Sequence, residues 1–293
     1  MAISAKTRVC GVIGDPIGHS LSPTIQNAAF SHLGLDFVFF AFQVKAANLE
    51  NAVRGMRGLG IHGLNVTMPH KSAVISYLDE VDSAATFLGS ANTILNEDGK
   101  LSGFNTDGVG GLNALRENGV DLSEKKVLLL GAGGAAKAIA FSFAQEAKSL
   151  CILNRVPEKA AVLADALNHV FGKKIVGGAL SPSAVQKNLQ DADILVNATS
   201  VGMHPNVNQS LVAPQWLKPN FAVMDIVYNP VETQLAKDAK AAGAKVVSGV
   251  EMLIYQGAAS FKIWTGKSAP IEAMRKAALN KLSSKVNASD REN

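Results

Sequence analysis

Cysteine is scarce in this chain, and the cysteine arrangements that build disulfide frameworks or metal sites are missing. The 293 residues include two cysteines, Cys10 and Cys151, each inside an apolar run. Two isolated cysteines of this kind predict buried thiols, no resident metal and a reducing environment such as the cytosol.

Runs of basic residues and uninterrupted apolar runs are missing as well. No stretch of five or more basic residues occurs, which argues against a nucleic-acid-binding surface, while the net charge of +4 suits small anionic ligands. The opening M-A-I-S-A-K-T-R has no apolar signal core, and glycines and Lys137 interrupt the most apolar stretch, Val127 to Ala144. We therefore expect a cytoplasmic protein that neither spans nor binds a membrane.

The composition that is present predicts a globular α/β protein. The chain is 47% hydrophobic and 18% charged, and it is long enough for two domains. Strand-like and helix-like segments alternate, with a regular βαβ rhythm from Lys126 onward, which predicts mainly parallel sheets covered by helices. In the first part we expect strands over 9–14, 37–44, 61–66, 92–96 and 101–105, and helices over 23–33, 46–59, 69–78 and 83–88.

A glycine-rich turn follows the strand-like segment that ends at Leu130. The residues from Gly131 to Ala136 read G-A-G-G-A-A, and a helix-like segment comes next. In this context Gly131 allows the tight turn, Gly133 allows a pyrophosphate to approach the backbone, and Ala136 allows close helix packing. Backbone N–H groups at a helix start hold phosphates, so the segment favours a dinucleotide site over a plain structural turn.

The tip of the next strand distinguishes between the two nicotinamide cofactors. An enzyme that uses NAD should carry Asp or Glu there for the ribose 2′-hydroxyl, whereas this chain has Asn154, Arg155 and Val156, followed by Lys159. An arginine fork can hold a 2′-phosphate. The pattern therefore favours NADP, with NAD still open, and the alternative is that Arg155 is a solvated residue at a strand end.

The nine residues from Gly63 to Lys71, G-L-N-V-T-M-P-H-K, place polar side chains after a short apolar strand. Polar residues at the C-terminal ends of strands are where open α/β sheets bind ligands. Pro69 predicts the start of a helix, so Lys71 would stand in its first turn, where the helix dipole disfavours a cation. Lys71 therefore either has a function or is an ordinary surface lysine.

Two further segments offer candidate ligand groups ahead of predicted helices. Ser20 and Ser22 precede Pro23, and two hydroxyls at a helix start form a credible carboxylate site. The alternative is that one serine is only the N-cap. Asp107, in the run G-F-N-T-D-G, is either a functional carboxylate or the cap of the following helix.

Taken together and in this order, the segments resemble the shikimate dehydrogenase family, which includes the shikimate/quinate dehydrogenases. The resemblance runs from about Val9 to Leu282. It is carried by G-D-P-I-G-H-S-L-S-P, N-V-T-M-P-H-K, G-S-A-N-T, G-F-N-T-D-G, G-A-G-G-A-A, N-R, N-A-T-S-V-G-M, D-I-V-Y-N-P and G-V-E-M-L-I-Y-Q-G-A. Each motif is weak alone, whereas their collinear order is highly specific.

The resemblance implies a role for each matching residue. Lys71 and Asp107 would form the catalytic pair. The substrate would be held by Ser20, Ser22, Asn65, Thr67, Asn92, Tyr228 and Gln256, with the serines on its carboxylate. The cofactor would be held by Gly131, Ala132, Gly133, Gly134, Ala135, Asn154, Arg155, Lys159, Thr199, Ile226, Gly249 and Met252.

The fold implied by the resemblance is α/β with two domains. Residues 1–107 and 250–285 would form a substrate-binding catalytic domain, residues 108–249 a Rossmann NADP-binding domain, and residues 286–293 a flexible tail. The implied activity is the reversible, NADPH-dependent reduction of 3-dehydroshikimate to shikimate in aromatic amino acid biosynthesis. A small-molecule substrate is then the expected partner, and a homodimer is an open option.

Two positions depart from the family pattern and leave alternatives open. Val156 stands where the family often has threonine, and it cannot donate a hydroxyl hydrogen bond to a 2′-phosphate. Gln26 stands where the family often has histidine. Some relatives that also oxidise quinate have glutamine at this position too. The alternatives are therefore a quinate/shikimate dehydrogenase that uses NAD, and a non-catalytic nucleotide-binding regulatory homologue. The presence of both Lys71 and Asp107 argues against the second.

Overall fold

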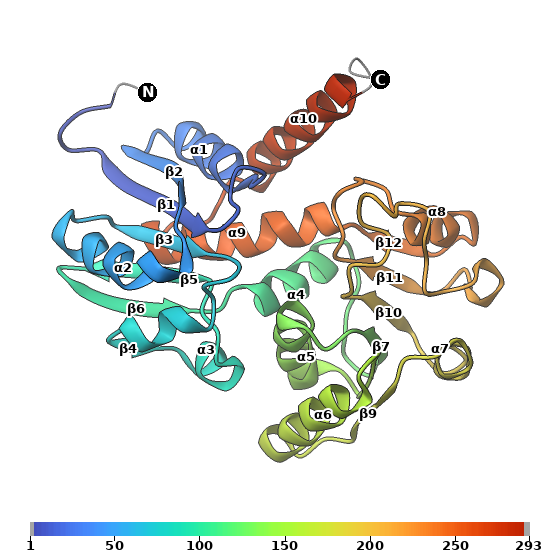
Figure 1. Ribbon diagram of the computed structural model, residues 1–293. Helices are drawn as coiled ribbons and strands as arrows, with labels where there is room; N and C mark the ends of the chain where they lie inside the picture. Colours follow the sequence, from blue (N-terminus) through green and yellow to red (C-terminus); the bar gives the residue numbers. More distant parts are fainter. Residues whose placement is uncertain (1–2, 290–293) are drawn as a thin grey trace. The chain divides into compact units, whose positions relative to one another are not determined.

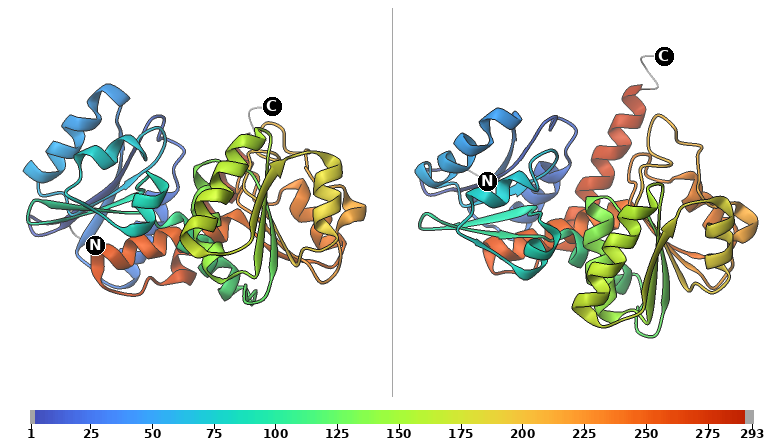
Figure 2. Two further views of the ribbon diagram at one scale, coloured as in Figure 1. Left: turned by 90° about the horizontal axis from the view of Figure 1, so that it is seen from below. Right: turned by 60° about the horizontal axis from the view of Figure 1, so that its bottom comes forward.

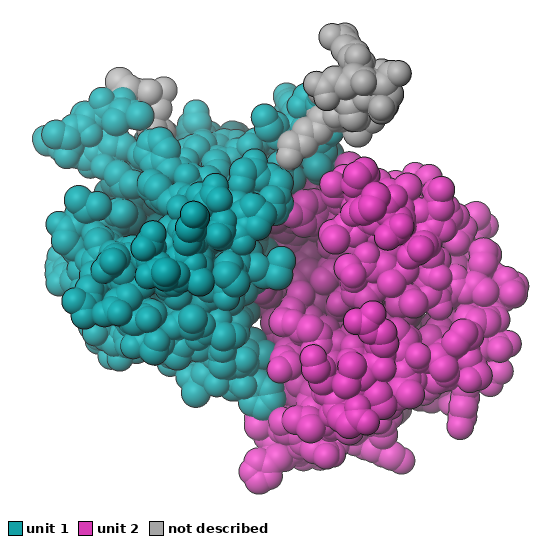
Figure 3. Space-filling model, in the orientation of Figure 1, with its two compact units in different colours: residues 1–106, 254–293 teal, residues 107–253 magenta. Residues whose placement is uncertain are grey.

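The computed structural model describes residues 3–289, with side chains described up to Ser284. It contains two compact units, one formed by Met1–Thr106 with Ile254–Asn293 and the other by Asp107–Leu253 (Figure 3). Each unit is built around its own six-stranded sheet (Figure 1). The expected domain limits differ slightly from these, because they place Asp107 in the first domain and residues 250–253 with the final helices.

The first unit contains a mixed sheet in the order β2-β1-β3-β5-β6-β4. Strand β1 is parallel to β2 and β3, whereas β5 is antiparallel to β3 and β6. The elements are β1 (Arg8–Gly14), α1 (Ser22–His32), β2 (Phe37–Gln43), η1 (Ala46–Asn48), α2 (Leu49–Gly58), β3 (Gly63–Val66), η2 (Ala73–Tyr77), β4 (Glu80–Val81), α3 (Ser83–Leu88), β5 (Thr93–Glu97), β6 (Lys100–Phe104), α9 (Gly249–Thr265) from Ile254 onward, and α10 (Ile271–Ser289).

Helices cover both faces of the first sheet and bury its apolar side chains. On one face α2 contributes Met56, which is fully buried in the core cluster. On the other face Phe30 of α1 stacks on Phe261 of α9, with ring centroids 5.3 Å apart. Trp264 of α9 lies directly against Gly63, so a side chain at that position would collide with the indole ring. The first glycine of the G-L-N-V-T-M-P-H-K segment is therefore a packing requirement.

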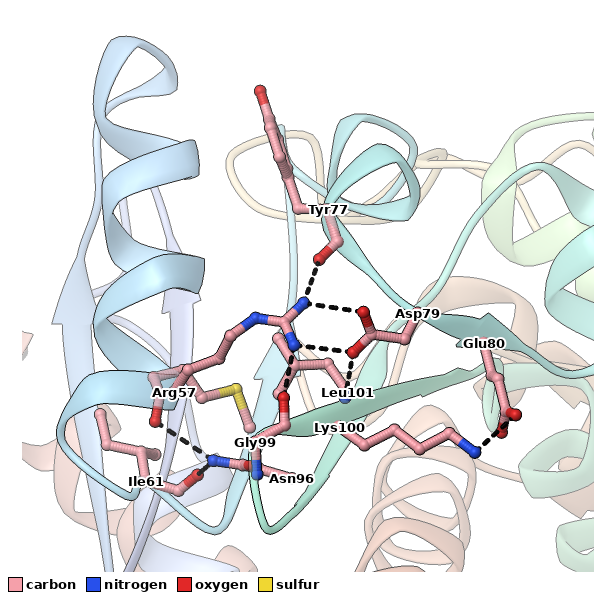
Figure 4. A network of polar contacts seen from close by, with 10 residues as sticks. Arg57, Ile61, Tyr77, Asp79, Glu80, Asn96, Gly99, Lys100 and Leu101 are labelled. Atoms are coloured by element: carbon pink, nitrogen blue, oxygen red, sulfur yellow. Dashed lines mark hydrogen bonds and ion pairs between the residues drawn. The ribbon is translucent and has the colours of Figure 1, made fainter.

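The guanidinium of Arg57 on α2 ties together three segments of the first unit (Figure 4). It donates to both carboxylate oxygens of Asp79, at 2.7 and 3.2 Å, and to the backbone carbonyls of Tyr77 and Gly99. Asp79 also accepts from the Leu101 N–H at 2.7 Å. The Arg57 hydrogen bonds, followed by the Leu101 N–H, lower the pKa of Asp79.

Replacing Arg57 with methionine is expected to lower the Tm by about 2–4 °C, because two carbonyls and a carboxylate lose their common donor. The difference from wild type should shrink as the pH falls through the lowered pKa of Asp79, since the ion pair stabilises the folded state only while that carboxyl is ionised. Thermal melts at neutral and acidic pH measure both effects. Arg54→Met is the matched control, because Arg54 lies on the same helix and pairs with the exposed Glu50. An equal fall in Tm in both variants would contradict the stabilising role of the Arg57 hydrogen bonds.

The second unit contains a parallel sheet in the order β12-β11-β10-β7-β8-β9. Its elements are α4 (Asp107–Glu117), β7 (Lys126–Leu130), α5 (Gly134–Glu146), β8 (Ser149–Asn154), α6 (Pro157–Phe171), β9 (Ile175–Ala179), α7 (Pro182–Leu189), β10 (Ile194–Asn197), η3 (Pro214–Trp216), β11 (Ala222–Asp225), α8 (Gln234–Ala241) and β12 (Lys245–Val247). Helices α5 and α6 lie on one face of this sheet, and α7 and α8 lie on the other (Figure 2). This is the strand order of the Rossmann fold, so the predicted fold class is confirmed.

The helix expected over 69–78 is the main error in the predicted elements. A turn precedes the short 3₁₀ helix η2, and Lys71 lies in that turn. The carbonyl of Lys71 accepts from the Ala91 N–H at 2.9 Å, so it does not join an α-helical hydrogen-bond ladder. A contact with a distant segment therefore overrides the local helix signal of Pro69.

Smaller differences concern elements that were not expected or that extend further. Strand β4 and helix α7 were not predicted, although Ser181 caps α7 by accepting from the Ala184 N–H at 3.1 Å. Helix α10 continues to Ser289, so the predicted tail over 286–293 begins inside a helix. Residues 290–293 lie outside the described part of the chain.

Candidate functional site

The end of β3 and the start of β5 bring predicted substrate residues of the first unit together. Asn65 lies in β3, Thr67 follows that strand, and Asn92 immediately precedes β5. The Thr67 methyl group packs beside Gly14 at the end of β1, and the Val66 N–H donates to the Asn92 carbonyl at 2.8 Å. Residues from separate segments of the chain therefore meet at one place in the sheet.

The carboxamide of Asn65 is buried, and its two ends have different surroundings. Its Nδ2 lies 3.1 Å from the Asn92 carbonyl, 3.1 Å from the Thr93 hydroxyl and 3.0 Å from the Ser260 hydroxyl. Its Oδ1 is buried and has no hydrogen-bond partner among the described residues. A buried acceptor without a donor costs free energy, so this oxygen is suited to accept a hydrogen bond from a ligand.

Lys71 lies in the turn that follows β3, and its side chain is partly buried. The Ala91 N–H binds its carbonyl, which holds the turn beside the segment that carries Asn92. His70 in the same turn is 1% exposed, and its Nε2 lies 2.6 Å from the Val44 carbonyl. Lys71 therefore stands in an ordered turn near two buried amides, which differs from the setting of a solvated lysine on a helix face.

The two serines of the predicted carboxylate site stand at the start of α1. Ser22 is the first helical residue, and the N-cap position is Leu21, without a side-chain cap. Neither serine therefore occupies the N-cap position itself. Ser20 Oγ accepts from the Ser22 N–H at 3.2 Å. Both side chains are partly exposed, at a helix end where the dipole favours an anion.

Gln26, which departs from the family pattern, joins α1 to α9. It is fully buried, and its Nε2 donates to the Gly257 carbonyl at 2.9 Å. Its Oε1 is buried without a partner among the residues described. This hydrogen bond attaches α9 to α1 at the residue that follows Gln256, the predicted substrate residue on α9.

The glycine turn between β7 and α5 has the geometry that its sequence predicts. Gly131 has φ +114°, and an added Cβ would lie 2.7 Å from the Ala198 carbonyl, so only glycine fits. Gly133 is the N-cap of α5, and no atom lies within 4 Å of the place where its Cβ would be. Ala136 is fully buried. The open backbone at Gly133 and the helix start behind it fit a pyrophosphate group.

The other predicted cofactor residues follow the C-terminal ends of neighbouring parallel strands. Because the carboxyl ends of parallel strands lie at one edge of a sheet, these residues lie along the same edge as the glycine turn. Gly249 packs directly against the Ile226 carbonyl. The set comprises Asn154 and Arg155 at the end of β8, Lys159 in α6, Thr199 after β10, Ile226 after β11, and Gly249 and Met252 at the start of α9.

The tip of β8 presents cations and an exposed valine. The side chains of Arg155 and Lys159 are exposed, and Asn154 Nδ2 donates to the Val156 carbonyl at 2.9 Å. Val156 is itself 41% exposed. Two cations at this strand tip, where an NAD enzyme carries a carboxylate, fit a phosphate on the adenosine ribose.

A buried network beneath the second unit's loops was not predicted. Asp225, 1% exposed, accepts from the Thr233 hydroxyl at 2.6 Å, from Asn197 Nδ2 at 2.9 Å and from the Val227 N–H at 3.1 Å. Burial raises the pKa of Asp225, and these hydrogen bonds oppose the rise. Asn197 Oδ1 accepts from the Thr199 hydroxyl at 2.7 Å. The network therefore holds Thr199 in place. In the sequence, Asn197 and Asp225 are the first residues of the motifs N-A-T-S and D-I-V-Y, and these two polar residues are the signal that could have indicated the network.

The predicted catalytic pair is divided between the units. Lys71 belongs to the first unit, whereas Asp107 is the first residue of α4 and, like Tyr228, belongs to the second. Asp107 is 8% exposed, and burial raises the pKa of Tyr228. Asp107 is the first residue of that helix.

Features that would indicate other classes of protein are not found in residues 3–289. No group of three or more His, Cys, Asp or Glu side chains there could hold a metal ion. No helix in that range is long and apolar enough to cross a membrane. Burial raises the pKa of Cys10 to about 12 and that of Cys151 to about 11, so both thiols are weak nucleophiles at neutral pH.

Comparison with known proteins places both units in one family. The model of the shikimate dehydrogenase substrate binding domain matches residues 12–94, that of shikimate / quinate 5-dehydrogenase matches residues 113–241, and that of the shikimate 5'-dehydrogenase C-terminal domain matches residues 249–279. The shikimate dehydrogenase (NADP(+)) of Methanopyrus kandleri is 48% identical over 285 residues, which is 96% of this chain and 98% of that protein.

Solved structures agree with these matches over nearly the whole chain. A shikimate dehydrogenase in complex with NADP+ has a TM-score of 0.89 and 44% identity, covering 96% of this chain and 98% of that one. The shikimate 5-dehydrogenase of Listeria monocytogenes, in complex with shikimate and NAD, has a TM-score of 0.90 and 37% identity, covering 94% and 98%. The family resemblance carried by the sequence motifs is thus confirmed, and this chain belongs to the shikimate dehydrogenase family.

Proposed function

We propose that this protein catalyses the reversible, NADPH-dependent reduction of 3-dehydroshikimate to shikimate, a step in aromatic amino acid biosynthesis. The observation that carries the proposal is the ordered turn of Lys71 beside the buried amides Asn65 and Asn92, in a chain of this family. When bound, the reduced cofactor NADPH would supply the hydride for reduction, and the oxidised cofactor NADP+ would accept it in the reverse direction. The side chains of the protein bind the substrate and move the proton.

Lys71 is proposed to give a proton to the substrate oxygen during reduction and to take it back during oxidation. An ammonium group in an ordered, partly buried turn can be directed at one oxygen, and a positioned proton donor speeds such a step by about 10²–10⁴-fold. Asp107, buried at the start of α4, is proposed as the second member of the catalytic pair.

The substrate residues are proposed to divide between its carboxylate and its hydroxyls. Ser20 and Ser22 would bind the carboxylate, which is supported by their place at the start of α1. Amide and hydroxyl groups would bind the ring hydroxyls, which is supported by the buried Oδ1 of Asn65, an acceptor without a partner in the described part of the chain. These groups belong to Asn65, Thr67, Asn92 and Gln256, and Tyr228 would lie between substrate and cofactor.

The cofactor residues are proposed to follow the edge of the parallel sheet in the second unit. The turn from Gly131 to Ala135 would hold the pyrophosphate, and the open backbone at Gly133 supports this. Arg155 and Lys159, with Asn154, would hold the 2′-phosphate. The nicotinamide half would contact Thr199, Ile226, Gly249 and Met252. Because Val156 adds no hydroxyl at the strand tip, NAD is expected to serve as a weaker cofactor.

We propose that the first unit is the substrate domain and the second is the NADP domain. The contents of each unit support this, since Asn65, Asn92 and Lys71 belong to the first, and the glycine turn belongs to the second. On the same family membership we propose a homodimer in the cytoplasm.

A steady-state oxidation assay tests the proposed function. Shikimate and quinate are each offered with NADP and with NAD, and kcat/KM for shikimate with NADP is expected to exceed every other combination by about tenfold or more. A higher kcat/KM for quinate with NAD would support a quinate/shikimate dehydrogenase instead. No turnover with any combination would refute an enzyme of this class and favour a nucleotide-binding regulatory protein.

A further inference from the structure

Two buried hydroxyl groups link the substrate residues of the first unit. Thr93, at the start of β5, and Ser260, on α9, are both 0% exposed, and their Oγ1 and Oγ atoms lie 2.7 Å apart. Ser260 follows Gln256 by one helical turn and lies 3.2 Å from its carbonyl. The pair therefore joins the strand ends to the helix that carries Gln256.

The orientation of the Asn65 amide follows from its neighbours. The Asn92 carbonyl can only accept a hydrogen bond, so the Asn65 atom facing it at 3.1 Å must be the donor Nδ2. The Thr93 and Ser260 oxygens, at 3.1 and 3.0 Å, offer further acceptors on the same side. The amide is therefore held with its NH₂ group toward this cluster and its oxygen on the other side.

The orientation of the Asn92 amide is set in the same cluster. The Thr106 N–H can only donate, and it lies 2.8 Å from Asn92 Oδ1. The Thr93 hydroxyl also donates to this oxygen, at 3.0 Å. Thr93 therefore accepts from one amide and donates to the other, which couples the orientations of Asn65 and Asn92.

We propose that the hydroxyls of Thr93 and Ser260 are positioning groups that hold the Asn65 and Asn92 amides in place for the substrate. With both hydroxyls present, Asn65 Oδ1 remains a buried acceptor without a partner in the described residues. A ligand that donates an O–H to this oxygen satisfies it, whereas a ligand lacking that hydroxyl leaves it unpaired. A site built in this way rejects the deoxy analogue strongly. This specificity rests on the proposed function, because it assumes that Asn65 contacts the substrate.

The kinetic test compares four variants: Thr93→Val, Thr93→Ser, Ser260→Ala and the double variant Thr93→Val/Ser260→Ala. The double variant is expected to raise the KM for shikimate about tenfold with less than about a threefold change in kcat. The preference for shikimate over its deoxy analogue should fall by a similar factor. This analogue lacks the hydroxyl that would donate to Asn65 Oδ1. Thr93→Ser, which keeps the hydroxyl, should stay within about twofold of wild type. Thr265→Val is the control, because that hydroxyl also binds a carbonyl one turn earlier on α9.

Two kinetic results would overturn the proposal. One is a double variant that keeps the wild-type preference for shikimate over the deoxy analogue. The other is a Thr93→Ser variant as impaired as Thr93→Val, since packing rather than the hydroxyl would then be responsible. Each variant is first checked by thermal melting for a folded state.

A spectroscopic test on the ligand-free protein separates this proposal from the proposed function. In wild type the two Asn65 Nδ2 protons should give distinct, hydrogen-bonded NMR signals, which are assigned by their loss in Asn65→Asp. The double variant should shift both signals and increase their exchange with water. Unchanged signals would overturn the positioning role even if shikimate is oxidised. Absence of shikimate oxidation by wild type, with the signals shifting as expected, would overturn the proposed function and support the positioning role.

Discussion

The Lys71→Met variant is expected to oxidise shikimate about 10²–10⁴ times more slowly than wild type, with the KM for shikimate changed by no more than a few-fold. Methionine keeps much of the length of lysine and removes the proton donor. The turn that carries Lys71 should survive, because it is held by the Lys71 carbonyl and by the buried His70 rather than by the ammonium group. Steady-state kinetics with shikimate and NADP measures kcat and KM separately.

The control for this variant is Lys100→Met in the same unit. Lys100 has a side chain that is 55% exposed and pairs with Glu80 on the surface, so its loss should leave kcat unchanged. A kcat for Lys71→Met within about threefold of wild type would contradict a role in proton transfer. A large rise in KM with unchanged kcat would instead identify Lys71 as a residue that binds substrate and transition state equally.

The Arg155→Ala variant is expected to raise the KM for NADPH about 10- to 100-fold while changing that for NADH little. A hydrogen bond between charged groups contributes about 1.5–3 kcal/mol, which corresponds to that range. The exposed guanidinium at the tip of β8 is available to a 2′-phosphate, and NADH has no such group. Reduction of 3-dehydroshikimate with each cofactor gives the two KM values.

The matched control for cofactor binding is Lys187→Ala. Lys187 is an exposed cation of the same unit on α7 and is not one of the predicted cofactor residues. Its removal changes the net charge by the same amount, so a similar rise in the KM for NADPH would mean that overall charge is responsible. Equal increases for NADPH and NADH in Arg155→Ala would contradict the assignment of Arg155 to the 2′-phosphate.

The second unit could be predicted closely because its signals are local. The apolar strand before Gly131, the glycine turn and the helix after it are consecutive in the chain, and the structure confirms each of them. Buried parallel strands read as continuous apolar runs, so β7, β8, β10 and β11 were readable from composition. Helix α7 was missed, although Ser181 and Pro182 provide a usable start signal.

The first unit was predicted less well around its candidate site. Pro69 indicated a helix over 69–78, yet the carbonyl of Lys71 bonds to Ala91, and only a short 3₁₀ helix follows. Sequence reasoning named Asn65 and Asn92 and missed Thr93 and Ser260. Hydroxyl residues are common in every kind of segment, so nothing local separates these two from the rest.

The sequence by itself determined the family, the glycine turn and the choice of Lys71 as the residue to test. Those features depend on residues that are neighbours in the chain and on the order of short motifs. Only the tertiary structure decided the turn that holds Lys71 and the contact between Thr93 and Ser260, whose positions are 167 residues apart. The physical reason is that a buried polar group must pair with whichever donor or acceptor the fold brings to it, and that choice is made by packing rather than by local pattern.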